Sequence, residues 1–279
     1  MILPASYFAL LVALLVFLVR LKRPSNDRPW KPDFARPAEA DLSGDTLTLR
    51  NIRNIRYGAP GTPFGAAWET RTYDLSTLKR LWFVVESFSD LEVVAHTLIS
   101  FEFEDDYLAF SAEARLEEGE PYDILRGMFG NFELSYTFGD ERDFILRRTT
   151  YQDHDVYLYP LTFSAAEVRA LLEDILKEAN HLRQNPAFYN SLGRNCTNLL
   201  GLHANHVRPG SFAWWRPEQA LPGLSDRLLH RKGWIDTALP FEGLREVYNV
   251  REEAQKHGDD PDVSRKVREG LPAYRKGQG

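Results

Sequence analysis

VVAHTLISFEFEDDYLAFSAEAR, residues 93–115, is the stretch that decides the expected fold. Apolar residues alternate with polar or small ones on both sides of the polar pair Asp105-Asp106, a pattern typical of a β-hairpin. Pairing Glu104 with Tyr107 brings apolar residues together on one face, as a half-buried strand pair requires. In that register Phe103 faces Leu108, Phe101 faces Phe110 and Ile99 faces Ala112.

The other face of this hairpin carries polar and charged side chains, among them His96, Ser100, Glu113 and Arg115. His96 then lies directly across from Arg115 and diagonally from Glu113, about 7–8 Å away between backbones, which long side chains can bridge. A carboxylate placed there can orient an imidazole and stabilise its protonated form. The hairpin therefore predicts a His-Glu pair, in a register that a one-residue bulge in the turn would break.

Strand-like runs on both sides of the hairpin predict an antiparallel sheet, followed by two helices. Ser164 and Glu167 form a capping box that opens a helix running to about Leu182. A second helix is expected to start at Cys196, with Asn195 as its N-cap. The pattern as a whole is that of an α+β domain. The strand-like runs span residues 46–49, 52–57, 80–88, 132–138, 143–148 and 156–161, with a charged turn at 140–143.

Cys196 is the only cysteine in the chain. At a helix N-terminus the helix dipole favours a thiolate, and backbone N–H groups there can stabilise an oxyanion. An imidazole is the usual partner that makes a thiol nucleophilic near pH 7, and His96 is the best-placed histidine. The non-catalytic interpretation is that Cys196 packs in the core, as free cysteines commonly do, and that His96 is a hydrogen-bonded strand residue. Together, Cys196, His96 and Glu113 favour a catalytic triad.

The amino-acid composition limits which classes of protein are possible. The chain has 279 residues, of which 43% are hydrophobic and 27% charged, as is ordinary for a globular protein with a packed core. Its formal charge of -6 argues against nucleic acid as the main partner, because phosphate binding relies on clustered Lys and Arg.

The N-terminal segment predicts a membrane anchor. A cleaved signal peptide is the rival interpretation, but the small-residue pattern that a signal peptidase needs does not follow the apolar run. The first 19 residues carry no charged side chain and would span on the order of 28 Å as a helix, close to the thickness of a bilayer core. We expect a transmembrane anchor over 1–21, a Pro-rich linker over 22–40, a thiol-enzyme domain over 41–235 and a charged extension over 236–279 that holds a short helix and a disordered tail. Basic residues follow the anchor, so the positive-inside rule places the body in the cytoplasm. They are Arg20, Lys22, Arg23, Arg28 and Lys31.

Four ordered motifs carry a resemblance to a known family. They are His96 to Phe103, Phe110 to Arg115, Asp140-Glu141-Arg142-Asp143, and Phe188-Tyr189-Asn190 followed by Asn195-Cys196-Thr197. Over roughly Trp30 to His206 the chain resembles the N-terminal periplasmic domain of Lnb-type lipoprotein N-acyltransferases. This resemblance implies a papain-like, NlpC-type domain in circularly permuted order, with an antiparallel sheet and packed helices.

The resemblance also implies roles for individual residues. Cys196 would be the acyl-accepting nucleophile, His96 the general base and Glu113 the third polar member. The family reaction moves a fatty acyl chain from a phospholipid, through a thioester, to the α-amino group of a diacylglyceryl-cysteine lipoprotein. It implies a periplasmic body on an inner-membrane anchor, against the charge rule, and no cofactor is expected. The residues that would position the site and stabilise the oxyanion are Asn195 and Thr197. The residues that would support the triad are Arg115, Glu141, Arg142 and Tyr189.

Several alternatives stay open. The chain beyond Pro209 has no apolar run of spanning length, so a thiol hydrolase or acyltransferase acting on another envelope substrate fits equally well. A non-catalytic envelope module that binds lipid or protein, and a cell-wall thiol peptidase, are the other classes. His203 and His206 could ligate zinc with Cys196, but no further clustered Cys or His completes the set, and no metal is expected. For Trp214-Trp215, core packing is favoured over contact with a membrane.

Overall fold

The computed structural model describes residues 22–58, 65, 67–213, 221–258, 260–272 and 274. The expected anchor over 1–21 and the pair Trp214-Trp215 lie outside these residues. Within the described ranges, no helix is both long enough and apolar enough to cross a membrane.

A central sheet of eight strands organises the molecule, in the order β1-β2-β7-β6-β5-β4-β8, with β3 paired to β2 off this path. Neighbouring strands are antiparallel except β2 and β7, which meet in parallel where Arg53 pairs with Gly139. The strands are β1 (Glu39–Ser43), β2 (Thr46–Arg53), β3 (Trp68–Asp74), β4 (Arg80–Ser87), β5 (Ala95–Glu102), β6 (Tyr107–Arg115), β7 (Glu133–Asp140) and β8 (Asp155–Pro160).

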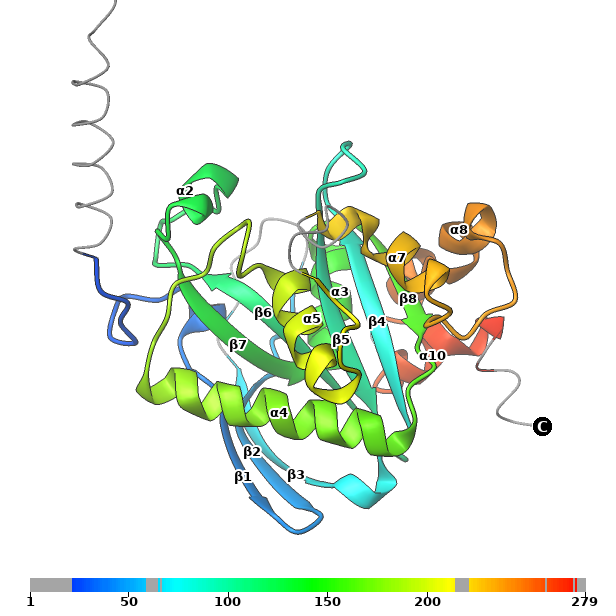
Figure 1. Cartoon of the computed structure of the whole chain (residues 1–279), viewed down its shortest axis with the longest axis horizontal. Coiled ribbons are helices and arrows are strands. Elements are labelled where there is room, and N and C mark those ends of the chain that lie inside the picture. Colours follow the sequence, from blue (N-terminus) through cyan, green and yellow to red (C-terminus); the bar gives the residue numbers. More distant parts are fainter. Residues whose placement is uncertain are drawn as a thin grey trace, which may run out of the picture.

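Helices cover the sheet, so the expected α+β class is confirmed. In Figure 1 the helices α4 and α5 lie in front of the sheet and α3 lies behind it. The helices are α2 (Ile124–Met128), α3 (Glu141–Leu146), α4 (Ala165–Gln184), α5 (Cys196–Val207), α7 (Ser225–Arg231), α8 (Leu244–Tyr248), α9 (Arg251–Lys256) and α10 (Val263–Glu269). Short turns are η1 (Pro32–Phe34), η2 (Leu75–Thr77), the π-helical η3 (Arg147–Tyr151), η4 (Pro222–Leu224) and η5 (Phe241–Gly243).

The predicted helix starts agree with the structure. Ser164 caps α4 and forms the capping box with Glu167. Asn195 caps α5, because its side chain accepts a hydrogen bond from the backbone N–H of Asn198. Cys196 is therefore the first residue of α5.

The predicted register of the β5–β6 hairpin is wrong by two residues. Tyr107 pairs with Glu102, not with Glu104. Phe103 leaves the ladder because its ring is buried against Tyr73, with ring centroids 4.9 Å apart, and its N–H donates to the carbonyl of Asp106. The connection is therefore longer than the two-residue turn that was expected. A shift of two keeps each residue on its predicted face, because side chains alternate with a period of two.

Strands β5 and β6 also separate at one end. Their pairing stops at Ile99 and Phe110, whereas β5 stays paired to β4 as far as Ala95 and β6 stays paired to β7 as far as Arg115. The sheet is thus split beside His96. The N-terminal end of α5 packs near this split, since Thr197 shares a 2.9 Å hydrogen bond with Thr97 of β5.

The strand predicted over 143–148 is a helix. Asp140 accepts a hydrogen bond from the N–H of Arg142 and so caps α3, which continues into η3. Phe144 and Ile145 are almost fully buried, so burial fixes this segment as a helix although its short apolar run also suits a strand.

In the described part of the chain after residue 236, three α-helices are present where the sequence suggested one. Arg268 of α10 is fully buried, and its guanidinium donates to Glu141 at 2.5 and 2.7 Å. The same guanidinium lies over the rings of Trp82 and Tyr107, at 4.6 and 4.0 Å from the centroids. Helix α10 is therefore part of the core that backs the sheet.

Candidate active site

Cys196 lies at the start of α5 with its side chain almost enclosed, since the residue is 2% exposed. Asn195 fixes the chain just before it by donating from Nδ2 to the carbonyl of Ser191, at 3.1 Å. Thr197 fixes the chain just after it through its hydrogen bond with Thr97. The two residues that the sequence assigned to positioning thus hold both sides of the thiol.

His96 lies near the start of β5, where this strand has parted from β6. Its Nε2 is 2.7 Å from Ser111 Oγ and 3.6 Å from Glu113 Oε1. Ser111 and Glu113 thus hold one ring nitrogen, and the imidazole also interacts with the Cys196 thiol through a hydrogen bond and through its charge. Helix α5 lies on one face of the sheet, and His96 points toward the other face. The gap between β5 and β6 lets the Cys196 thiol and the His96 imidazole meet.

Cys196 and His96 each stabilise the charged form of the other. Burial alone would raise the pKa of the Cys196 thiol, but the His96 charge, its hydrogen bond and hydrogen bonds from Thr97 lower that pKa to about 7. Burial alone would lower the pKa of His96, but the thiolate and Glu113 raise it to about 9. Thiolate and imidazolium therefore coexist over a window that includes neutral pH.

Glu113 sits between His96 and two buried arginines. Arg148 Nη2 lies 3.2 Å from Glu113 Oε1, and Arg53 Nη1 lies 3.8 Å from Glu113 Oε2. Burial would raise the pKa of this carboxyl, but the hydrogen bond with His96 and the charges of Arg53 and Arg148 hold it well below its usual range. Glu113 is therefore an anion at neutral pH and can hold the imidazole in place.

A second carboxylate, Glu86, was missed from the sequence. It pairs directly with His96 across β4 and β5. Arg148 Nε lies 2.7 Å from Glu86 Oε2, and His154 Nδ1 lies 2.8 Å from Glu86 Oε1. Arg148 thus bridges Glu86 and Glu113. The available signal was a lone charge at the end of the apolar run 81–85, next to a strand that carries a candidate catalytic histidine.

Arg115 does not support His96, which corrects the expectation from the hairpin. In the observed register it lies farther along β6, where its guanidinium donates to the carbonyl of Phe34 and to Asn26 and lies 4.1 Å above the Trp30 ring. It therefore holds the N-terminal linker against the sheet.

Glu141 and Arg142 are also remote from the thiol. Glu141 pairs with Arg268, and Arg142 donates to Asn54. Their neighbour Asp143 pairs with the buried Arg53 at 3.0 Å and accepts from the N–H of Ile55. The charged motif at 140–143 is thus a salt-bridged corner at the start of α3.

Tyr189 is brought to the site. It is buried, and the backbone N–H of Cys196 donates a hydrogen bond to its hydroxyl. Burial raises the pKa of this phenol well above its ordinary value, so it stays a hydrogen-bond donor. A phenol at the helix start is a group that can stabilise an oxyanion.

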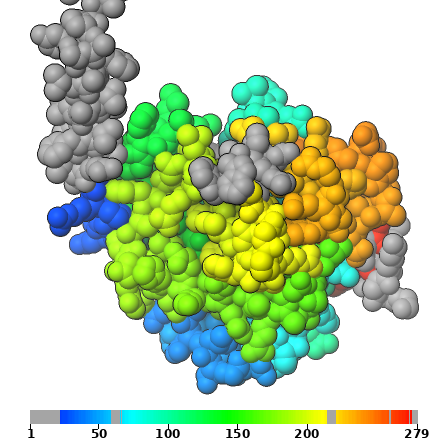
Figure 2. All heavy atoms as spheres, viewed as in Figure 1, coloured from blue at the N-terminus to red at the C-terminus, as the bar shows by residue number. Residues whose placement is uncertain are grey.

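The thiol and the imidazole open into a cleft of about 360 Å³. Its lining includes large apolar side chains that are also exposed to solvent. Figure 2 shows that the α2 segment (green) and the loop between β4 and β5 (cyan) stand at the same end of the molecule. The exposed apolar residues that line the cleft are Phe88, Tyr122, Ile124, Leu192 and Leu221.

A family model described as the Lnb N-terminal periplasmic domain matches residues 65–220. The chain belongs to this family. The match contains His96, Glu113 and Cys196. No curated protein and no solved structure matches the chain.

Membership in the Lnb family makes this a periplasm-facing domain of an envelope protein. The matched range also contains Glu86, Arg148 and Tyr189, so most of the cluster around the thiol belongs to the family domain. It leaves out Arg53 and the helices after residue 220, which pack against that domain.

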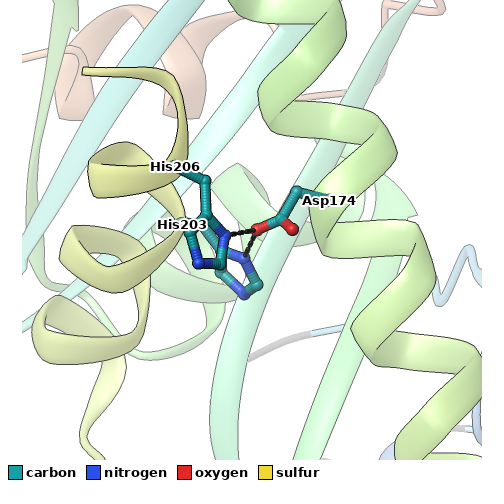
Figure 3. Close-up of side chains that lie close together, drawn as sticks. All are labelled: Asp174, His203 and His206. Carbon is teal, nitrogen blue, oxygen red and sulfur yellow. Dashed lines mark hydrogen bonds and ion pairs between the residues drawn. The ribbon is translucent and has the colours of Figure 1, made fainter. Parts of the chain in front are cut away.

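A second cluster of polar side chains lies between α5 and α4. His203 and His206 point toward Asp174 of α4, each through Nδ1 at 2.6 Å from Oδ2 (Figure 3). The sequence suggested Cys196 as their partner in a zinc site. Cys196 faces His96 at the other end of α5, and Asp174 takes its place beside the histidines.

Proposed function

We propose that this protein is a cysteine-dependent acyltransferase or hydrolase of the cell envelope that works through an acyl-thioester on Cys196. One observation carries the proposal: Cys196 begins α5 and lines the same cleft as His96, whose Nε2 is held by Ser111 and Glu113. The mutual pKa shifts of the thiol and the imidazole agree with this arrangement. A thiol that only packs in a core has its pKa raised by burial, because no charged partner compensates.

In the proposed mechanism the Cys196 thiolate attacks the carbonyl carbon of an ester. The Tyr189 hydroxyl, which accepts a hydrogen bond from the backbone N–H of Cys196, donates to the resulting oxyanion and stabilises it. The tetrahedral intermediate collapses, the C–O bond breaks, and His96 gives its proton to the leaving alcohol. The product is an acyl-thioester on Cys196 and a neutral imidazole.

The second half of the cycle releases the acyl group. Neutral His96 takes a proton from an attacking amine or water, which adds to the thioester carbonyl and expels the thiolate. Glu113, held by Arg148 and Arg53, keeps the imidazole oriented and balances its charge in both halves. An amine acceptor gives acyl transfer, and water gives hydrolysis.

The apolar lining of the cleft favours a lipid as acyl donor. Exposed Ile124 and Leu192 lie at the cleft that holds the thiol, and burying such side chains against an acyl chain is favourable by roughly 25 cal/mol per Å². Together with membership in the Lnb family, this supports a phospholipid donor and the amino terminus of a lipoprotein as acceptor. A cell-wall peptide would call for a more polar groove than these residues provide.

Trapping of the covalent intermediate tests the proposal. The full chain is mixed with vesicles that carry a phospholipid with a fluorescent acyl chain, and protein-bound label is measured on a denaturing gel with and without hydroxylamine. We expect hydroxylamine-sensitive label that is absent in Cys196→Ala and strongly reduced in His96→Ala. Exposed His181→Ala serves as the matched control and should label like wild type. Equal labelling of Cys196→Ala would overturn the proposal.

A separate measurement tests the lipid assignment. Ile124→Glu and Leu192→Glu should slow the labelling from vesicles about tenfold or more while leaving iodoacetamide alkylation of Cys196 unchanged. Leu202→Glu, an exposed leucine that does not line the cleft, is the control. Unchanged labelling in both cleft variants would rule out this surface as the acyl-chain contact.

A further inference from the structure

We propose that Asp174, His203 and His206 form a binding site for a divalent cation of the zinc class. Their ligand atoms, Asp174 Oδ2 and the Nδ1 atoms of both histidines, all lie within 4.8 Å of one another. Both imidazoles on α5 are directed at one carboxylate oxygen on α4 (Figure 3).

The ligand types suit a borderline metal ion. Two imidazole nitrogens and one carboxylate oxygen are a common set of three protein ligands for Zn²⁺, with the fourth position left to water. Ligand atoms on a tetrahedral zinc lie roughly 3.4 Å apart, because each metal–ligand bond is about 2.1 Å long. The present 2.6 Å separations therefore need to open by under 1 Å. Asp174 and His206 can supply this movement, because their side chains are 26% and 67% exposed.

His203 already has a hydrogen-bond partner on its far side. The Tyr136 hydroxyl lies 2.8 Å from Nε2 of His203, the ring nitrogen that faces away from Asp174. When Nε2–H donates to this hydroxyl, the lone pair of Nδ1 is available to a cation on the Asp174 side. In the metal-free protein a hydrogen on Nδ1 can donate to Asp174 instead, and a bound cation would replace that hydrogen. Metal-ligating histidines usually have such an outer partner, which fixes their tautomer.

The local charge favours a cation. Besides Asp174, the negative charge of Glu178 acts on His203. Glu178 lies one turn after Asp174 on α4, so both carboxylates are on the side of α4 that faces α5. The site is half open, because Asp174 and His206 remain accessible to solvent while His203 is buried.

The bound ion would hold α5 against α4. Asp174 is on α4, and His203 lies seven residues after Cys196, about 10 Å farther along α5. The ion is thus too far away to touch the thiol, but it braces the helix that begins with the thiol. This inference does not depend on the proposed acyl chemistry.

Cobalt and zinc titrations of the full chain without a histidine tag test the site. We expect one equivalent of Co²⁺ to bind with the visible d–d bands of tetrahedral coordination, and Zn²⁺ to displace it. Asp174→Asn and His206→Ala should each weaken binding by ~10–100-fold or more, because each removes or neutralises a ligand. His181→Ala, an exposed histidine on the same helix as Asp174, should bind like wild type.

Two controls keep the result interpretable. Circular dichroism of the metal-free variants should match metal-free wild type, which shows that the fold is retained. Tyr136→Phe keeps the ring but loses the outer partner, and should weaken Zn²⁺ binding by ~10–100-fold. Absence of saturable binding in wild type, or equal binding in Asp174→Asn and His206→Ala, would overturn the site. So would a sulfur-to-cobalt charge-transfer band that disappears in Cys196→Ala, because it would make Cys196 the ligand.

Discussion

At the scale of single residues, Cys196 and His96 form the feature on which the chemistry depends, and the thiol pKa near 7 gives a direct test. Alkylation of Cys196 by iodoacetamide should follow a titration with a midpoint near pH 7 in wild type, whereas an ordinary thiol titrates near 8.5. In His96→Ala the midpoint should rise above 8.5, because burial raises the thiol pKa once the imidazolium is gone. A midpoint that does not respond to His96→Ala would contradict the pairing.

Loss of Arg148 should lower the stability of the protein strongly. It is buried between Glu86 and Glu113, at 2.7 and 3.2 Å. Arg148→Met leaves both carboxylates with one partner fewer in a buried site, and we expect a loss of ~3–5 kcal/mol in the free energy of unfolding. Urea denaturation followed by fluorescence measures this loss. Exposed Arg265→Met, which breaks only surface ion pairs, should change it by less than ~1 kcal/mol.

Glu86 predicts how stability depends on pH. Burial alone would raise its pKa, but Arg148 and His154 lower it from 4.5 to about 2. A lowered pKa in the folded state adds stability above the unfolded-state pKa, and this stability is lost as pH falls from about 4.5 to about 2. Urea midpoints should therefore drop across this window in wild type and drop less steeply in Glu86→Gln. Parallel curves for the two proteins would argue against a buried, paired Glu86.

At the scale of elements, the sequence identified most strands and both main helices because their signals are local. The capping box at Ser164 and the N-cap Asn195 are read within four residues, and both agree with the structure. The hairpin register was missed because it depends on Phe103 packing against Tyr73, which is 30 residues away in sequence. The strand assigned to 143–148 failed for a similar reason, because burial of Phe144 under the sheet selects a helix.

The same limit applies to the candidate site. Cys196, His96 and Tyr189 meet, and each has a motif of its own in the sequence. Glu86 leaves only the weak signal of a lone charge after an apolar run, and the position of η3, which brings Arg148 to it, has no local signal in the sequence.

The contact between β7 and α3 offers a test at this scale. A Cβ on Gly139 would lie 2.2 Å from the Phe144 ring and 2.9 Å from the carbonyl of Arg53, where β2 meets β7. Gly139→Ala should therefore lower the free energy of unfolding by ~1–3 kcal/mol. Gly243→Ala, with open space around its Cβ, is the control. Urea denaturation that finds no difference between the two would show that this packing is looser than described.

At the scale of the whole molecule, the folding unit is larger than the matched range 65–220. Arg53 from β2 pairs with Asp143, and Arg268 from α10 pairs with Glu141, so the core beneath the sheet uses residues from both sides of that range. Three residues of the C-terminal helices are also completely buried, namely Leu244, Tyr248 and Val263.

A chain ending at residue 240 should therefore fail to fold properly. It would expose the faces of Trp82 and Tyr107 that Arg268 covers and leave Glu141 buried without its partner. We expect loss of the near-ultraviolet circular dichroism signal and of a cooperative urea transition. A chain ending at residue 274 should keep both. Cooperative unfolding of the shorter chain would show that α8–α10 are dispensable.

The enclosure of Cys196 has a consequence for redox chemistry. A disulfide needs its two sulfurs about 2.05 Å apart, and the periplasm is a compartment in which exposed thiols readily form such bonds. This chain has no second cysteine to form one internally, and a sulfur at 2% exposure cannot approach the sulfur of another folded molecule that closely. The protein should therefore stay monomeric on non-reducing gels after air oxidation, with its one thiol still available to small reagents that enter the cleft.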